Sequence, residues 1–179
     1  MKKSNALTET NKLALNRLEN FDKDRGCFAC GLNNPIGLKM EFYSDGQTVF
    51  SWLTVPQNLC GWRNIIHGGI ITTIMDEAMS WTAHHLIKKL ILTKTINVQF
   101  LHPLYVEKRI QVEGRVALIN GEREAELTAL IINDSGKKCA QATGTFALLK
   151  PKTARRMGVI DETIIRNFEQ HIEMSNSTQ

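Results

Sequence analysis

The chain has 179 residues, 42% hydrophobic and 22% charged, which fits one soluble globular domain with a substantial core. Its net charge of +4 and its basic cluster at 150–156 permit a polyanionic partner, either a nucleotide-bearing substrate or a nucleic acid, but equally fit a solvated surface. The basic start lacks a following apolar run and cleavage site, and four cysteines without such a signal predict reduced thiols in a cytoplasmic protein.

The first predicted element is a short amphipathic helix over residues 6–22, where leucines and Phe21 recur at roughly helical spacing. A loop rich in turn-forming residues follows at 27–37. Two strand-like runs, 38–42 and 49–55, then flank a Ser-Asp-Gly turn, which predicts a hairpin.

A long helix is predicted over residues 68–85, which contain no proline and repeat apolar side chains at three- and four-residue spacing. The surrounding stretch 70–87 is the most apolar of the chain, yet Asp76 and Glu77 interrupt its middle. Charges at that depth are costly in a bilayer, so we expect a core helix and no membrane insertion. A helix with such a wide apolar face needs a sheet around it.

The second half of the chain predicts four strands and a closing helix. The strands are expected at 91–101, 109–119, 123–133 and 138–149. Asn-Gly and Asp-Ser-Gly turns separate the later strands, so we expect an antiparallel meander. The helix is expected from Asp161, a plausible N-cap, to Glu173. The whole pattern predicts an α+β fold, an antiparallel sheet wrapped around a long central α-helix, with short N- and C-terminal helical appendages.

We expect three segments. Residues 1–26 form an N-terminal helical extension, residues 27–150 the main domain, and residues 151–179 a C-terminal helical tail.

Two glycines open the central helix and suggest a binding site. The first-turn N–H groups of a helix lack intrahelical acceptors, and Gly68 and Gly69 let another group approach them closely. Such donors can polarise a carbonyl and hold an oxyanion. Asp76, among apolar neighbours, is a candidate catalytic carboxylate, although an acidic residue on a helix more often faces solvent or caps a neighbour.

Helix geometry separates these two groups. Gly68 and Asp76 lie roughly 12 Å apart along the axis, too far for one carbonyl to contact both. If both serve one reaction, the second contact comes from an antiparallel copy of the helix across a two-fold axis. This predicts a homodimer with two equivalent sites.

Several ordered motifs resemble the hotdog-fold thioesterases of the PaaI type. These are His67-Gly68-Gly69 with an acid nine residues after the His, the run from Thr93 to Pro103, the Cys27-Phe28-Ala29-Cys30-Gly31 segment before Asn34-Pro35, and the run from Ala142 to Phe146. The resemblance covers about residues 27–149. It implies a hotdog fold and an enzyme that hydrolyses an acyl-CoA thioester to a free acid and CoA. It implies no cofactor beyond the CoA of the substrate, no nucleic acid, and a homodimer or homotetramer.

The resemblance also implies roles for single residues. Asp76 is the general base or nucleophile, and the Gly68 N–H polarises the thioester carbonyl. His67 shapes the turn before it, and Thr93 helps to position the attacking water. Glu77 is the alternative to Asp76 as the catalytic carboxylate. Neighbouring helical residues point about 100° apart, so only one of the two should face the site. The family's spacing between the His and the acid selects Asp76.

One departure from the family weakens the catalytic assignment. Many relatives carry Asn or Gln six residues before the His, where this chain has Gly61. Gln57 and Asn58 are nearby substitutes, and Lys94 is a candidate for the CoA phosphates, with Gly69 also facing the substrate. Two alternatives follow: a hotdog protein that binds acyl-CoA without hydrolysis, and a hotdog dehydratase.

Cys27 and Cys30 resemble half of a zinc knuckle or a redox pair. A structural zinc site needs two further ligands, and no second Cys-x-x-Cys or closely spaced His pair follows. We therefore expect no metal site.

Overall fold

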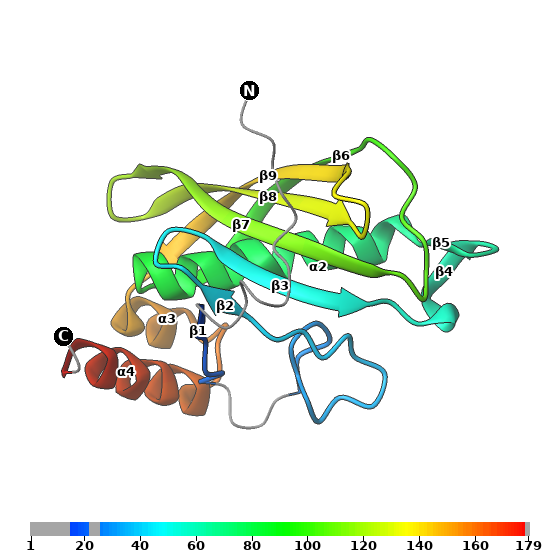
Figure 1. Ribbon diagram of the computed structural model, residues 1–179. Helices are drawn as coiled ribbons and strands as arrows, with labels where there is room; N and C mark the ends of the chain where they lie inside the picture. Colours follow the sequence, from blue (N-terminus) through cyan, green and yellow to red (C-terminus); the bar gives the residue numbers. More distant parts are fainter. Residues whose placement is uncertain (1–14, 22–25, 178–179) are drawn as a thin grey trace.

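A seven-stranded antiparallel sheet curves around one long helix, α2 (Gly68–Thr82), in the computed structural model, which describes residues 15–21 and 26–177 (Figure 1). The sheet order is β1 (Asn16–Arg17), β2 (Tyr43–Ser44), β3 (Val49–Thr54), β7 (Arg109–Asn120), β8 (Glu124–Asn133), β9 (Lys138–Leu149) and β6 (Leu90–Phe100). This confirms the predicted α+β arrangement of a sheet wrapped around a central helix.

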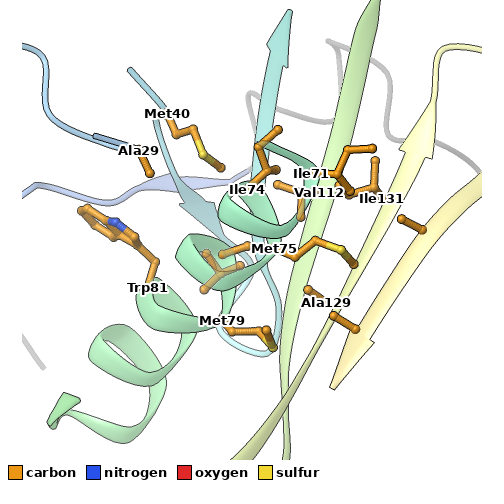
Figure 2. Close-up of a cluster of buried hydrophobic side chains, with 14 of the residues drawn as sticks. Ala29, Met40, Ile71, Ile74, Met75, Met79, Trp81, Val112, Ala129 and Ile131 are labelled. Atoms are coloured by element: carbon orange, nitrogen blue, oxygen red, sulfur yellow. The ribbon is translucent and has the colours of Figure 1, made fainter. Parts of the chain in front are cut away.

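Helix α2 forms the centre of the core. Its buried side chains include Ile74, Met75 and Met79, which face the sheet across from Val112 on β7 (Figure 2). Burying each such side chain contributes roughly 1.5–3 kcal/mol. The sheet approaches α2 closely at Gly114, where an added Cβ would lie 2.7 Å from the carbonyl oxygen of Ala78. None of the helices in the described residues is long and apolar enough to cross a membrane.

The strands after α2 form a meander only in part. Strands β7, β8 and β9 pair in sequence order, as expected. Strand β6 pairs with β9 instead of β7, so it lies at the end of the sheet. The expected meander of the later strands is therefore confirmed, and β6 lies outside it because the segment from Leu101 to Lys108 carries the chain across the sheet.

The N-terminal helix is not seen where the chain is described. Asn16 and Arg17 pair with β2, and the Leu18 N–H donates to the Phe42 carbonyl at 2.9 Å. Pairing with a neighbouring strand therefore overrides the helical spacing of the leucines at residues 15–21, and the rest of this prediction lies outside the described residues. The predicted hairpin forms, but its first strand, β2, is Tyr43–Ser44 and lies after the predicted run 38–42.

A small hairpin leads into α2. A 3-10 turn (Gln57–Leu59) precedes β4 (Cys60–Trp62), which pairs with β5 (Ile65–Ile66). The sequence did not predict this hairpin, since each arm is only two or three residues long. It brings the chain to His67, whose N–H donates to the Leu59 carbonyl at 3.1 Å.

Two helices, α3 (Pro151–Met157) and α4 (Glu162–Ser177), pack near the C-terminal end of α2 (Figure 1). The Asp161 carboxylate accepts the Thr163 N–H at 2.7 Å, which confirms the expected N-cap. Helix α3 was not anticipated. Its Arg155 forms ion pairs with Glu162 and Glu169 on α4, so part of the basic cluster joins the two helices.

His84 lies in the π-helical turn Ala83–Ile87, which follows α2 directly. Its ring packs against Phe21 and Phe168, and Nδ1 lies 2.8 Å from the Lys89 carbonyl. Burial lowers the pKa of His84 to about 4, with His171 adding repulsion.

The contribution of His84 to the stability of the fold should therefore be lost in acid. A His whose folded pKa is depressed stabilises the fold above its unfolded pKa of about 6.5, and this contribution is lost as pH falls toward 4. At each pH we take the unfolding free energy of wild type minus that of His84→Gln. This difference should be about 2 kcal/mol larger at pH 7.5 than at pH 5. Denaturant unfolding of both proteins at both pH values measures this, and groups common to both cancel. An equal difference at the two pH values would contradict the prediction.

Candidate active site

Asp76 contacts Thr93, as the predicted site requires. The Thr93 hydroxyl on β6 donates to Asp76 Oδ1 at 2.9 Å. Burial raises the pKa of Asp76, and the Thr93 hydrogen bond opposes that rise. The carboxylate is partly buried, whereas Thr93 is exposed on the strand that ends the sheet. The pair therefore provides a positioned carboxylate at a surface that a second molecule can reach.

Glu77 points to a different environment. Its carboxylate accepts the Trp81 indole N–H at 3.0 Å and lies 3.8 Å from the Cys27 thiol. No hydrogen bond joins Glu77 to Thr93 among the residues that the structure describes. The two neighbouring carboxylates thus face separate sites, as the 100° turn between helical neighbours requires.

The start of α2 presents an amide donor. His67 is the N-cap, and its Nδ1 accepts the Gly69 N–H at 3.0 Å. The His67 carbonyl accepts the N–H groups of Ile70 and Ile71 at 2.9 and 3.1 Å. Within the described part of the chain the Gly68 N–H has no acceptor. His67 therefore fixes the turn, takes up the Gly69 donor and leaves that of Gly68 for a ligand.

A groove of about 600 Å³ opens at this helix start. Its walls come from the β4–β5 hairpin, the first turn of α2 and the end of β6, and include Trp62, Gly68, Phe100 and His102. Trp62 is 83% exposed and Phe100 57% exposed. Such exposed aromatic side chains beside a hollow are typical of a binding or association surface. The sequence prediction missed them, although their closeness to the His-Gly-Gly and Thr-to-Pro motifs could have indicated them.

The chain does not bring its two predicted reactive groups together. Asp76 and Gly68 lie on the same helix, roughly 12 Å apart along its axis. The groove at Gly68 includes neither Asp76 nor Thr93. Within a single chain the two predicted groups thus lie apart, Gly68 at the start of α2 and Asp76 near its middle.

The other predicted residues are mostly engaged elsewhere. The Gln57 amide donates to the Arg63 carbonyl at 2.9 Å, within the hairpin. Lys94 pairs with Glu124. Asn58 is exposed and does not line the groove. At Gly61, an added Cβ would lie 3.3 Å from His67 Cα, so an amide side chain there would press on the N-cap.

Residues 63–140 match the family model of the thioesterase superfamily. An uncharacterized protein of Schizosaccharomyces pombe is 35% identical over 97 residues, which are 50% of this chain and 53% of the relative. Verlamelin biosynthesis protein B of Lecanicillium is 26% identical over 69% of this chain and 61% of its own length. The chain thus spans little more than half the length of these curated relatives.

Solved structures share the fold. The thioesterase superfamily protein RHA08564 matches with a TM-score of 0.63 and 20% identity, over 69% of this chain and 60% of that one. The PaaI protein of E. coli, from an operon for phenylacetic acid degradation, matches with a TM-score of 0.57 and 16% identity, over 63% and 81%. A Streptococcus mutans protein bound to acetyl CoA matches with a TM-score of 0.57 and 17% identity, over 62% and 88%. The predicted resemblance to hotdog-fold thioesterases is confirmed.

Proposed function

Since residues 63–140 match the thioesterase superfamily on a hotdog fold, we propose that this protein hydrolyses an acyl-CoA thioester to a free acid and CoA. The observation that carries the proposal is the Asp76–Thr93 hydrogen bond, which holds a partly buried carboxylate at the edge of the sheet. A carboxylate whose pKa is raised by burial is a stronger base toward water than an exposed one.

In this mechanism, the Gly68 N–H donates to the thioester oxygen. Asp76 takes a proton from a water that the Thr93 hydroxyl helps to orient, and this water attacks the carbonyl carbon. Negative charge then develops on the oxygen, next to the positive end of the α2 dipole. Collapse of the intermediate breaks the carbon–sulfur bond, and the CoA thiolate leaves and takes up a proton. Asp76 acting as a nucleophile would give the same products through an anhydride.

The site is complete only with a second copy of the chain. Strand β6 is eleven residues long and ends the sheet, so one row of its backbone groups lacks a partner strand among the described residues. A long open edge is a template for pairing with another strand. Antiparallel pairing of two β6 strands around a two-fold axis would also run the two α2 helices antiparallel. Gly68 of the partner subunit would then approach Asp76, and exposed Phe100 would become buried.

CoA binding has indirect support. The Streptococcus mutans protein with this fold holds acetyl CoA. The groove beside Gly68 has room for a thioester arm and an exposed indole, Trp62, at its wall. Lys94 and Lys150 are each paired with a glutamate, so they would have to exchange that partner for a CoA phosphate.

One observation favours a second function, binding of acyl-CoA without hydrolysis. The amide that many relatives place near the carbonyl is absent at Gly61, where His67 leaves little room for a side chain, and Gln57 is bonded within its own hairpin. The groups that remain for catalysis are Asp76, Thr93 and the Gly68 N–H.

A panel of acyl-CoA substrates of increasing chain length separates these functions. We expect release of free CoA thiol, catalysed by the protein, for at least one acyl class, with a water-derived oxygen in the acid product. Binding by calorimetry without thiol release for every acyl-CoA would favour the binding protein. Hydration of an enoyl thioester would indicate a dehydratase.

A further inference from the structure

A group of three metal-binding side chains lies outside the site described above. Cys27 and Cys30 come from the loop that precedes β2, and Glu77 follows Asp76 on α2. Their two Sγ atoms and one carboxylate oxygen all lie within 4.8 Å of one another. We propose that Cys27, Cys30 and Glu77 bind a zinc ion, with water as the fourth ligand.

The spacing of these atoms suits zinc. A tetrahedral zinc ion bonds sulfur at about 2.3 Å and carboxylate oxygen at about 2.0 Å, which places a sulfur and an oxygen ligand roughly 3.5 Å apart. The Cys27 Sγ lies 3.8 Å from both oxygens of Glu77. An ion can therefore enter with shifts of well under one bond length. Two thiolates with one carboxylate are ligands that suit Zn²⁺ better than Mg²⁺ or Ca²⁺.

Each candidate ligand also accepts an N–H from a neighbouring group. The Cys30 amide donates to Cys27 Sγ at 3.5 Å, the Asn20 side chain to Cys30 Sγ at 3.6 Å, and the Trp81 indole to Glu77 at 3.0 Å. Such outer hydrogen bonds orient metal ligands and favour their anionic forms. They are arranged here before any ion is bound.

The three side chains are acidic groups that lie close together. No basic side chain of the described residues forms an ion pair with Glu77. A divalent ion would displace the thiol protons and offset two of the three negative charges of the bound ligands.

The loop that carries the cysteines is held in place by its own backbone. The Leu38 and Met40 N–H groups donate to the Phe28 and Ala29 carbonyls, both at 2.9 Å. Gly37 permits this approach, since an added Cβ there would lie 2.7 Å from the Phe28 carbonyl oxygen. Figure 2 shows Ala29 and Met40 on the side of α2 that carries Trp81. The ion would fasten this loop to α2 one residue from Asp76, and so help to position the helix face that carries the carboxylate.

A disulfide between Cys27 and Cys30 is the competing use of this pair. It would remove the Cys27 thiol that can donate to Glu77 and leave this partly buried carboxylate with the Trp81 indole as its donor, which is unfavourable. The carboxylate has a role in the zinc site and none in the disulfide, which is why we favour the metal.

The test uses the full chain, reduced, freed of metal and then titrated. We expect one Zn²⁺ per chain by calorimetry and elemental analysis, and a thiolate-to-metal charge-transfer band when Co²⁺ replaces it. Cys27→Ser, Cys30→Ser and Glu77→Gln should each weaken Zn²⁺ binding by at least ~100-fold, since even an outer-shell partner is worth ~10–100-fold. Cys60→Ser, which changes a cysteine outside the cluster, should bind as wild type does.

Circular dichroism and thermal unfolding show whether each variant is folded, and these near-isosteric changes should leave the fold intact. Failure of the reduced wild type to take up stoichiometric Zn²⁺ would overturn the proposal. So would unchanged binding in the folded Cys30→Ser protein. A Cys27–Cys30 disulfide by intact mass, with no metal uptake after reduction, would identify a redox pair instead.

Discussion

Asp76→Asn is expected to lower acyl-CoA turnover by about 10²- to 10⁴-fold, the usual contribution of a positioned general base. Asparagine keeps the shape of the side chain and can still accept the Thr93 hydroxyl, which donates at 2.9 Å in the wild type. It cannot take a proton from water. The measurement is kcat and KM by thiol release, and the loss should appear in kcat because the base acts only in the transition state.

The fold should survive this change, because burial already disfavours the charged form of Asp76. Thermal unfolding checks this point. Asp134→Asn, in the exposed turn between β8 and β9, is the matched control and should leave turnover unchanged. Near-normal turnover in Asp76→Asn would remove Asp76 from the mechanism. A loss of turnover in Glu77→Gln that Cys30→Ser does not share would show that the rival carboxylate is the base, because both changes remove a proposed zinc ligand.

Gly68→Pro is expected to lower kcat by roughly 10²- to 10³-fold, the typical cost of removing one oxyanion donor. Proline deletes the N–H that the mechanism assigns to the thioester oxygen, and little else. The first position of a helix tolerates proline well. The preceding residue, His67, has φ −59° and ψ 136°, a conformation that a following proline permits.

Gly68→Ala is the control for this change, since it keeps the N–H and adds only a Cβ. That Cβ would lie 3.5 Å from the Phe100 ring, which is ordinary van der Waals contact. We expect Gly68→Ala to retain turnover within several-fold of wild type. Equal losses in the alanine and proline variants would show that space at residue 68, not its N–H, matters for the reaction.

The elements that the sequence predicted well are the long, strongly patterned ones. The central helix begins at Gly68 as expected, and the predicted strands at 91–101 and 138–149 differ from β6 and β9 by at most one residue at either end. Alternation and turn residues are local signals. The place of β6 beside β9, rather than β7, depends on a crossover that no local signal reports.

Some residues of the candidate site also carry a local sequence signal, whereas others meet only in the folded chain. Asp76 and Gly68 could be selected from a helix with a Gly-Gly start and an acid in an apolar stretch, but Thr93 was assigned only by resemblance, and the structure brings it to Asp76. The contact of Glu77 with Cys27 joins residues fifty positions apart. The sequence argument against a metal site considered only Cys and His as further ligands. It therefore did not take the Glu77 carboxylate into account.

The central claim is that each active site combines Asp76 of one subunit with Gly68 of another, and mixing two inactive variants tests it most directly. Asp76→Asn and Gly68→Pro homodimers are dissociated together and reassembled, with different tags on the two chains to isolate mixed dimers. Each mixed dimer then holds one site with both defects and one intact site. An equal mixture should recover about one quarter of wild-type turnover per chain, because half of the dimers are mixed and each has one intact site of two. Isolated mixed dimers that are as inactive as their parents would contradict the account.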